Sequence, residues 1–313
     1  FHQLSLHYSV MAAYIDNWWS NVNLEYILDE TDKYEAYAKT VILNWTNRII
    51  FAHIIKHKQN SAMIVDEIDY DKSSVDANKI FKKITEKCDF YNVFSAIKYN
   101  EILPDFAWRD FVEFSTFLRS NGIDHLSQEI LQNILEGSVS TSKREINGQY
   151  ATPVELAKLL VRLTVKDWSD TILDCCCGTG TIPKEAIEIK KTQMTSKEAV
   201  ETVWACDKNK YPLQVANISM TDSDTINIAN RLFQHNALTL SVGEKISIID
   251  PKTGHNMILT IPSFGAVVSN LPFVPFEVIP DDDKNEIVKM PFMSNLDGRS
   301  DLYCYIANKI VDV

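Results

Sequence analysis

The sequence predicts an α/β fold in which a parallel sheet is preceded by an all-helical N-terminal domain. In residues 1–147, apolar side chains recur at intervals of three and four residues, which is the period of an amphipathic helix. From Thr171 onward, short apolar runs of strand length alternate with helical stretches, which indicates βαβ units and a parallel sheet. We therefore expect a helical domain over residues 1–147 and a second domain over residues 148–313.

The helical region has three segments with a clear helical period. They are Tyr34–Ile55, Ala77–Lys87 and Ser127–Leu135. The stretch Gln59–Ser74 is acidic and rich in Asn and Ser, and this composition predicts a loop between helices.

Four apolar runs in the second region have the length of buried strands. They are Thr171–Cys175, Thr202–Cys206, Arg231–His235 and Gly265–Ser269. The helical stretches Ile182–Lys190 and Tyr211–Met220 stand between them, and crossovers of this kind bring the carboxyl ends of the strands to one edge of the sheet, where ligands bind. Lys245–Ile249 and Asn256–Ile261 flank a turn and predict an inserted hairpin, which we interpret as an edge decoration.

Length and composition limit the class of protein. The chain has 313 residues, of which 45% are hydrophobic, so it can build a sizeable core. No apolar run approaches the roughly 18–20 residues that cross a bilayer, and we expect a cytoplasmic protein. The net charge of −11 argues against a polybasic nucleic-acid binder. If DNA is the substrate, another segment or subunit is expected to hold it.

The six cysteines do not form the pattern of a disulfide framework. Cys175, Cys176 and Cys177 are consecutive, and the other three are scattered. No Cys-x-x-Cys pair suggests a zinc site, and we expect no metal. The cysteines are interpreted as small apolar residues of a protein in a reducing compartment.

An apolar strand ends abruptly in Asn270-Leu271-Pro272-Phe273. Pro272 has no N–H and biases Leu271 toward an extended conformation, which presents the carbonyl group of Leu271. Asn270 supplies a second acceptor, and Phe273 supplies a face for stacking on a base. The alternative is a strand that stops at a proline turn with a core phenylalanine behind it.

The first predicted strand leads into a glycine-rich loop, Asp174-Cys175-Cys176-Cys177-Gly178-Thr179-Gly180-Thr181. Gly178 and Gly180 allow a tight turn and a close approach of the backbone to a ligand, and Thr181 is a candidate cap of the following helix. The loop lacks the third glycine of the dinucleotide fingerprint and the Gly-Lys-Ser/Thr of a P-loop, which disfavours a pyrophosphate or triphosphate ligand.

Polar side chains also end the second and third predicted strands. Asp207 stands where a carboxylate accepts hydrogen bonds from ribose hydroxyl groups in nucleoside-binding sheets, or where it caps a helix. Asn236 is the polar side chain best placed to meet an adenine ring, or it forms a turn.

Taken in order, Gly148-Gln149-Tyr150-Ala151-Thr152-Pro153, the glycine-rich loop and Asn270-Leu271-Pro272-Phe273 resemble the motifs of N6-adenine DNA methyltransferases of the gamma arrangement. The resemblance is greatest to modification subunits or domains of restriction systems, especially type I, and spans roughly residues 110–310. It implies a Rossmann-like class I S-adenosylmethionine-dependent methyltransferase sheet behind a helical N-terminal domain.

The resemblance also implies roles for individual residues. The expected S-adenosylmethionine contacts are Tyr150, Thr152 and Pro153 on one side of the pocket, Asp174, Cys176, Gly178 and Gly180 around the methionine, Asp207 at the ribose, and Asn236 at the adenine. The expected catalytic residues are Asn270, Leu271, Pro272 and Phe273. Asn270 and the carbonyl group of Leu271 accept hydrogen bonds from the target amine, and Phe273 stacks on the flipped base.

The implied activity is methyl transfer to adenine N6 in DNA, within a restriction-modification or related defence system. The implied partners are double-stranded DNA, bound through a target-recognition domain or specificity subunit outside this chain, and a restriction subunit. The sequence ends shortly after Ser300–Tyr305, which resembles the helix that follows the catalytic motif. We therefore expect the methyltransferase domain to be incomplete at its C-terminal end.

Three alternatives to adenine methylation stay open. The family usually has Pro where this chain has Leu271, which keeps a non-catalytic S-adenosylmethionine-binding or scaffold subunit in view. Glutamine N5-methylation of proteins uses a similar loop, but the Gly-Gln-Tyr-x-Thr-Pro segment argues against it. N4-cytosine methylation ranks lower because its loop usually starts with Ser or Thr.

Overall fold

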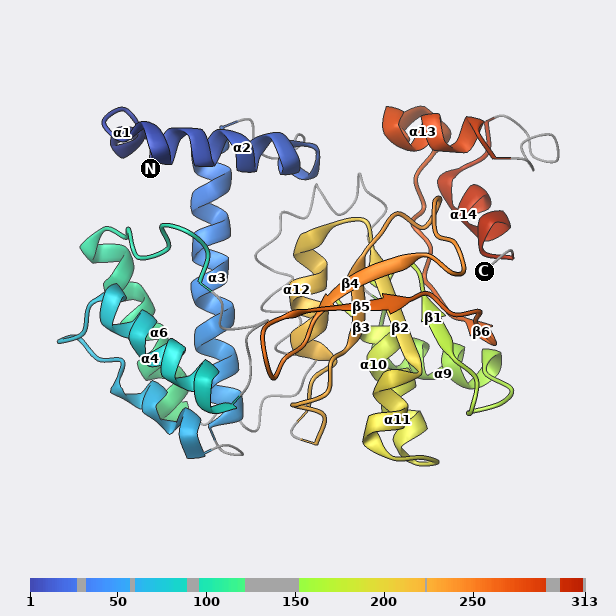
Figure 1. Cartoon of the computed structure of the whole chain (residues 1–313), viewed down its shortest axis with the longest axis horizontal. Helices are drawn as coiled ribbons and strands as arrows, with labels where there is room; N and C mark the ends of the chain where they lie inside the picture. Colours follow the sequence, from blue (N-terminus) through green and yellow to red (C-terminus); the bar gives the residue numbers. More distant parts are fainter. Residues whose placement is uncertain are drawn as a thin grey trace. The chain divides into compact units, whose positions relative to one another are not determined.

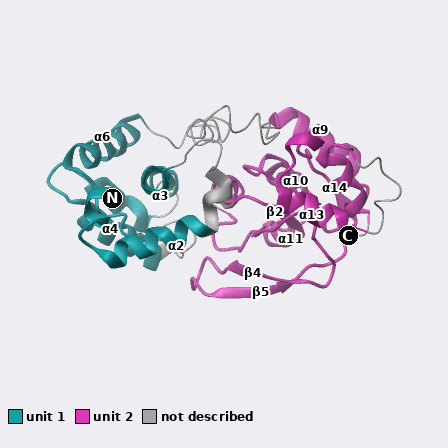
Figure 2. Cartoon of the chain, turned by 90° about the horizontal axis from the view of Figure 1, so that it is seen from above, with its two compact units in different colours: residues 1–88, 94–126, 137–143 teal, residues 89–93, 127–136, 144–313 magenta. Residues whose placement is uncertain are grey.

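The computed structural model divides the chain into two compact units, one made of the described residues up to 121 and one made of those from 152 onward (Figure 2). The structure describes residues 1–26, 32–56, 60–88, 96–121, 152–222, 224–290 and 299–311. The expected boundary between 147 and 148 lies outside the described residues. In the described part, no helix is both long enough and apolar enough to cross a membrane.

The first unit is helical (Figure 1). Its elements are α1 (His2–Ser5), α2 (Ser9–Tyr26), α3 (Lys33–Ile55), the 3-10 helix η1 (Asn60–Glu67), α4 (Ser74–Cys88) and α6 (Asp105–Asn121). The predicted helices Tyr34–Ile55 and Ala77–Lys87 are confirmed. The predicted helix Ser127–Leu135 lies outside the described residues.

The predicted loop Gln59–Ser74 is wrong in part, because η1 occupies residues 60–67. Ala62 and Val65 are three residues apart, which places them on one face of a 3-10 helix. Both are fully buried, and η1 packs against α3 and α4. Burial of these two apolar side chains therefore orders a stretch whose composition is that of a loop.

Helix α3 begins where its sequence supplies a cap and carries the centre of this unit's core. The side chain of Asp32 accepts hydrogen bonds from the backbone N–H groups of Tyr34 and Glu35. Further along the helix, Trp45 is fully buried, and its indole N–H donates to the carbonyl oxygen of Asn100 at 2.8 Å. Trp45 also packs edge-on against Trp108. These tryptophans are anchors of the core.

The second unit contains a parallel sheet of four strands in the order β3-β2-β1-β6. The strands are β1 (Ile172–Asp174), β2 (Val203–Asp207), β3 (Arg231–Gln234) and β6 (Ala266–Val267). All four predicted strands are therefore present, although β6 is much shorter than the predicted run. Of the predicted strand Gly265–Ser269, only Ala266 and Val267 pair with β1 in regular register.

Side chains of β2 alternate between the two faces of the sheet, and both faces are covered. Trp204 and Cys206 join a core on one face of the sheet, whereas Val203 joins a different core on the other face. All five residues of β2 are buried, as expected for a central parallel strand. The mixed α/β class predicted from the sequence is confirmed.

The covering elements of this unit follow in chain order (Figure 1). They are α9 (Val154–Thr164), α10 (Thr181–Lys191), α11 (Ser196–Glu201), α12 (Lys210–Ser219), β4 (Lys245–Ile249), β5 (Asn256–Thr260), η3 (Phe276–Val278), α13 (Asp281–Val288) and α14 (Leu302–Ile310). The predicted hairpin is confirmed, since β4 and β5 pair antiparallel. Ile246 and Ile248 of β4 alternate with exposed residues and face the core.

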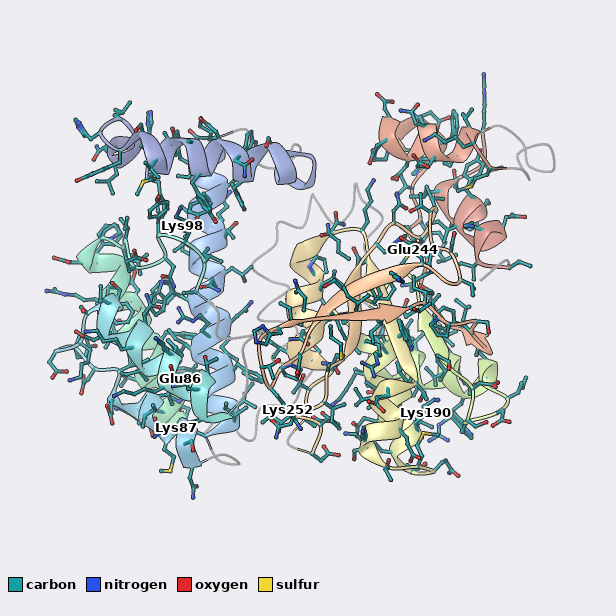
Figure 3. The ribbon with its side chains drawn as sticks, viewed as in Figure 1. Glu86, Lys87, Lys98, Lys190, Glu244 and Lys252 are labelled. Atoms are coloured by element: carbon teal, nitrogen blue, oxygen red, sulfur yellow. The ribbon has the colours of Figure 1, made fainter. Side chains whose placement is uncertain are left out.

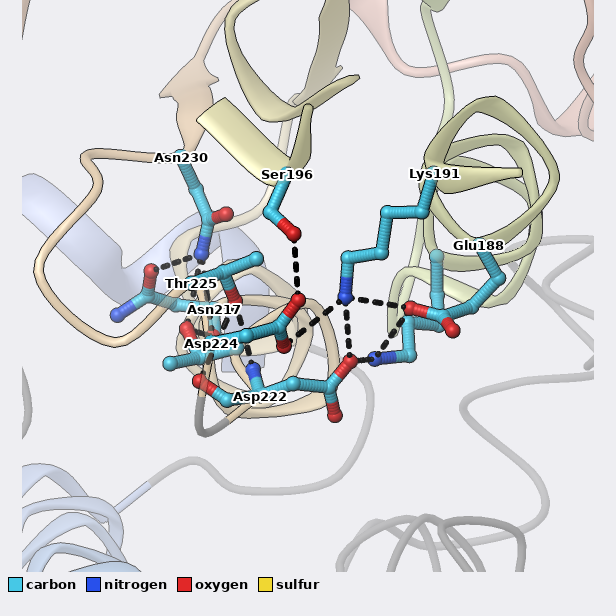
Figure 4. A network of polar contacts seen from close by, with 10 residues as sticks. Glu188, Lys191, Ser196, Asn217, Asp222, Asp224, Thr225 and Asn230 are labelled. Atoms are coloured by element: carbon cyan, nitrogen blue, oxygen red, sulfur yellow. Dashed lines mark hydrogen bonds and ion pairs between the residues drawn. The ribbon is translucent and has the colours of Figure 1, made fainter. Parts of the chain in front are cut away.

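A polar network joins α10 to the first residue of α11 and to the segment that follows α12 (Figure 4). The Lys191 Nζ lies 2.9 Å from Glu188 Oε1, 3.1 Å from Asp222 Oδ2 and 3.2 Å from Asp224 Oδ1. The Ser196 hydroxyl donates to Asp224 at 2.6 Å, and Asp222 also pairs with Lys184. The network therefore ties α10, which begins directly after the glycine-rich loop, to α11 and to the segment after α12.

Lys190 is fully buried near the amino ends of β1 and β2 (Figure 3). Its Nζ donates to the carbonyl oxygen of Asp170 at 2.6 Å and to Thr202 Oγ1 at 2.8 Å. Burial lowers the pKa of this ammonium group to about 8. The folded protein therefore loses the Lys190 proton at a lower pH than the unfolded chain does.

We expect the free energy of unfolding to rise between pH 8 and 10.5 because the unfolded state then binds more protons at Lys190. Urea denaturation gives the free energy of unfolding of wild type and of Lys190→Met at pH 7.5 and at pH 9.5. The contribution of Lys190 is the amount by which the difference between the two proteins changes from the lower pH to the higher. Lys197→Met, which removes an exposed lysine from α11, is the control. A difference between wild type and Lys190→Met that stays constant with pH would contradict the prediction.

Candidate functional site

Acidic and polar side chains meet where β1, β2 and β6 end. Asp174 ends β1 and Asp207 ends β2, and Ser269 follows β6 by two residues. Because these strands are parallel neighbours, their carboxyl ends lie at one edge of the sheet. The Ser269 hydroxyl donates to Asp174 Oδ1 at 2.6 Å, so the segment after β6 is joined directly to the end of β1.

The glycine-rich loop is joined to the end of β2 by two backbone hydrogen bonds. The N–H of Cys177 donates to the carbonyl oxygen of Cys206 at 2.9 Å, and the N–H of Gly178 donates to Asp207 Oδ2 at 3.1 Å. Gly178 has a φ of +51°, and a Cβ added there would have no atom within 4 Å. The backbone at Gly178 therefore faces open space beside a carboxylate.

Gly180 meets a different requirement from Gly178. It caps the N-terminus of α10 with a φ of +89°, a left-handed conformation that favours glycine. A Cβ at this position would lie 2.9 Å from the Cβ and 3.0 Å from the Cα of Ala216 in α12. The expectation that Thr181 caps α10 is wrong, because the left-handed turn at Gly180 already ends the loop and Thr181 is the first helical residue.

Asp174 is a buried carboxyl group with unusual electrostatics. Its side chain is within hydrogen-bond distance of the Ser269 hydroxyl and of the Cys176 N–H, at 3.2 Å from Oδ1. In the described part of the chain, no hydrogen bond reaches Asp174 Oδ2. Burial raises the pKa of Asp174 to about 7, the charge of Asp207 adds to this rise, and the two hydrogen bonds oppose it.

Asp207 retains room for further donors although it is buried. Its Oδ1 accepts from the N–H of Asn209 at 2.8 Å and its Oδ2 from Gly178, and burial raises its pKa. A carboxylate offers about four lone-pair sites, so two remain for a ligand. Asp174 and Asp207 together make this edge suited to a ligand that brings positive charge and hydroxyl donors.

Asn270 lies against the segment that enters α9. Its Nδ2 donates to Thr152 Oγ1 at 3.2 Å, which joins residues 118 positions apart in the chain. This bond orients the side-chain amide of Asn270. Thr152 and Asn270, which the sequence assigned to the two halves of the site, are therefore neighbours in space.

The two residues after Leu271 form a tight turn that leaves an aromatic ring exposed. The N–H of Val274 donates to the carbonyl oxygen of Pro272 at 3.1 Å, and Leu271 packs partly against the core. Phe273 is 57% exposed, and its ring lies 5.5 Å from that of Tyr303 in α14, at an interplanar angle of 50°. The alternative of a core phenylalanine is wrong, and an exposed aromatic face is consistent with stacking.

The sequence comparison with family models gives a match over residues 125–296 to the N-6 DNA methylase family. This segment covers more than half of the 313 residues. The chain belongs to the N-6 DNA methylase family. The comparison with curated proteins gave no match.

Within this N-6 DNA methylase domain, the structure brings most of the predicted site residues together. Thr152 contacts Asn270, Cys176 contacts Asp174, and Gly178 contacts Asp207. Pro153 is exposed and caps α9. Tyr150, predicted to shape the pocket, lies outside the described residues, as do the other residues of 148–151.

Asn236 is held by the chain itself. Its Nδ2 donates to Asp283 Oδ1 at 2.8 Å, and its Oδ1 accepts from the N–H of Leu238 at 3.0 Å. The second bond closes a local turn. Such a turn was the alternative to adenine binding that the sequence predicted for Asn236. The first bond fixes which end of the amide group points to α13.

Four contributors to this edge were missed by sequence reasoning. They are Ser269, Tyr303, Lys208 and Asp283. Ser269 could have been found, because it directly precedes Asn270 at the end of a strand. Neighbouring side chains on a strand point to opposite faces, so a polar residue beside Asn270 is a candidate for the other side of the site. Asp283 carries no such signal, because Asp281-Asp282-Asp283 has the pattern of an ordinary acidic first turn of a helix.

The five cysteines whose side chains the structure describes are free thiols. Cys175, Cys177 and Cys206 are buried, and Cys176 is half-buried. Burial raises the pKa of the Cys177 and Cys206 thiols well above the ordinary value, which disfavours the nucleophilic thiolate. Apolar packing therefore accounts for these cysteines.

We expect Gly180→Ala to lower the free energy of unfolding by about 2–5 kcal/mol, because left-handed strain adds to overpacking against Ala216. Gly178→Ala is the matched control, with left-handed strain but open space, and should cost about 1–2 kcal/mol. Chemical denaturation of both variants checks the order. Equal losses would contradict the close approach of α12 to the loop.

Proposed function

We propose that the protein transfers a methyl group from S-adenosylmethionine to the N6 amine of adenine in DNA. The observation that carries the proposal is the pair of adjacent residues Ser269 and Asn270. Ser269 bonds to Asp174 on the donor side, and Asn270 bonds to Thr152 at the start of α9. Membership of the N-6 DNA methylase family supports the same reaction.

The residues at the sheet edge fit the proposed cofactor. Asp174 offers a carboxyl oxygen for the ammonium group of the methionine moiety, and Asp207 offers acceptor sites for the ribose hydroxyl groups. The open space at Gly178 admits a ligand against the backbone. When bound, S-adenosylmethionine supplies an electrophilic methyl group. The parallel sheet is accordingly proposed to be Rossmann-like and of class I.

The catalytic loop is proposed to hold the target amine. The lone pair of adenine N6 is delocalised into the ring, which makes the amine a poor nucleophile. Asn270 Oδ1 and the carbonyl oxygen of Leu271 accept hydrogen bonds from its two N–H groups and favour a more tetrahedral nitrogen. Because Asn270 Nδ2 donates to Thr152, the amide presents its oxygen as the acceptor. The target adenine must flip out of the duplex, which costs about a few kcal/mol, and Phe273 then stacks on the flipped base.

The biological setting is also a proposal. We infer a gamma-type enzyme of a type I-like restriction-modification or related defence system that acts in the cytoplasm. The net charge of −11 favours duplex DNA being held by a target-recognition domain or specificity subunit. A restriction subunit is the further partner proposed.

A non-catalytic S-adenosylmethionine-binding subunit is the second candidate. Leu271 favours it, because proline at that position would stiffen the turn that presents the carbonyl group. The family match favours DNA over protein glutamine as the substrate. An assay of methyl transfer distinguishes the two candidates, because both bind S-adenosylmethionine and only the enzyme transfers its methyl group.

We expect the full-length protein with its partner subunits to form N6-methyladenine in host DNA, measured by tritiated methyl transfer and nucleoside analysis. Asn270→Ala should lower the rate at least about 100-fold, because it removes a transition-state contact. Its affinity for S-adenosylhomocysteine, measured by calorimetry, should change little.

Thr152→Val is the control for Asn270→Ala, because it removes the same hydrogen bond and keeps the amide oxygen of Asn270. A similar loss of transfer in both variants would mean that the Thr152 hydrogen bond is needed to aim the amide oxygen, whereas a much smaller loss in Thr152→Val would assign the effect to the amide oxygen itself. Absence of N6-methyladenine from the wild-type complex would refute the proposed reaction.

The affinity for S-adenosylhomocysteine should rise about tenfold from pH 6 to pH 8, because Asp174, with a pKa of about 7, must ionise to pair with the ligand's ammonium group. Calorimetry at several pH values measures it. Asp174→Asn should bind more weakly and with a flatter pH profile. Wild type and Asp174→Asn bind the same ligand. If their affinities changed with pH in the same way, the pH dependence would come from the ligand and not from Asp174.

A further inference from the structure

We propose that Asp283 is a positioning residue that couples the cofactor's adenosine end to the catalytic loop. This inference rests on the proposed function. Asp283 lies on α13, ten residues after Phe273, and is only 3% exposed. Its Oδ1 accepts hydrogen bonds from Asn236 Nδ2 and Lys208 Nζ, each at 2.8 Å.

The two partners of Asp283 come from the two strand ends expected to hold adenosine. Lys208 directly follows Asp207 at the end of β2, and Asn236 follows β3. The side-chain amide of Gln234 also donates to the carbonyl oxygen of Lys208 at 2.9 Å, which joins the same two strand ends. Asp283 therefore contacts both sides of the expected adenosine site with one oxygen atom.

The amide group of Asn236 has one orientation in this arrangement. Leu238 donates to its Oδ1, so its Nδ2 is the end that meets the Asp283 carboxylate. A buried carboxylate requires a compensating charge, and Lys208 supplies it. Removal of the charge at Asp283 weakens the hydrogen bond to the Asn236 amide group and leaves the Lys208 ammonium group paired with Asp282 alone, which alters the surface that an adenine ring would meet.

The chain between Phe273 and Asp283 is held by a backbone hydrogen bond and by buried side chains, so a displacement of α13 also displaces the loop. The carbonyl oxygen of Val274 accepts from the N–H of Leu302 at 2.9 Å, and Val274 and Ile279 are buried. Both pack in the core cluster that includes Leu238, two residues after Asn236. The catalytic loop, α13 and the end of β3 thus share one packed core, in which small shifts are transmitted.

Asp282 provides a matched control within the same helix turn. It also lies 2.8 Å from Lys208 Nζ, but it is about half exposed, and in the described part of the chain the Asn236 amide group donates to Asp283 and not to Asp282. A general role of negative charge near Lys208 would make the two aspartates equivalent. A positioning role through Asn236 makes Asp283 alone important.

The experiment compares Asp283→Asn with Asp282→Asn in the full-length complex. We expect the affinity for S-adenosylhomocysteine to fall about tenfold or more in Asp283→Asn, which corresponds to about 1.4 kcal/mol, and to stay within about twofold in Asp282→Asn. Free adenosine should show the same loss, and free methionine should not. The loss should also disappear in an Asn236→Ala background, because the two residues act as one unit.

Hydrogen exchange measures the coupling to the catalytic loop. S-adenosylhomocysteine should slow exchange in residues 274–288 of wild type, and this protection should be lost in Asp283→Asn. Should Asp283→Asn fail to fold, Asp283→Glu keeps the charge, displaces the oxygen from Asn236 and should show the same loss of affinity.

Each outcome decides between the proposals. A folded Asp283→Asn that binds the ligand as wild type does, with unchanged protection, overturns the role of Asp283 and leaves the proposed function intact. Weak binding by Asp283→Asn together with no N6-methyladenine from wild type overturns the proposed reaction and leaves the positioning role. Wild type that does not bind the ligand overturns both.

Discussion

The pairing of β6 with β1 is the constraint on which the rest of the site depends. Two register pairs, Ile172 with Ala266 and Leu173 with Val267, place β6 beside β1. They carry Ser269 to the end of β1, where it bonds to Asp174. Because side chains alternate along a strand, a slip of one residue would turn Ser269 away from Asp174 and separate the proposed catalytic loop, residues 270–273, from the acidic edge.

The acidic edge exists because the backbone compensates for part of the burial of two carboxyl groups. Burial raises the pKa of both Asp174 and Asp207, which means that the folded chain alone does not fully stabilise their charges. Backbone N–H groups of Cys176, Gly178 and Asn209 offset some of this cost. A ligand with cationic and hydroxyl donors would reduce the desolvation cost that remains, and this reduction would contribute to its binding free energy.

Sequence reasoning worked where a local pattern carries the information. The four strands, the hairpin and the long helix α3 were found because apolar period, length and turn residues act over a few positions. It failed where packing overrides local composition, as in η1, where burial of Ala62 and Val65 orders an acidic stretch. For Phe273 it offered a stacking face with a core position as the alternative, and the structure decides against the core position because the ring is exposed.

The sequence by itself determined the class of fold, the order of the motifs and the identities of the residues that end the strands, because these follow from local periodicity and residue chemistry. The tertiary structure decided which of those residues meet. Thr152 reaches Asn270 across 118 positions, and Asp283 reaches Asn236 through a helix with no motif of its own. Such contacts depend on strand register and helix packing, which sum many weak interactions along the whole chain and leave no mark at either residue.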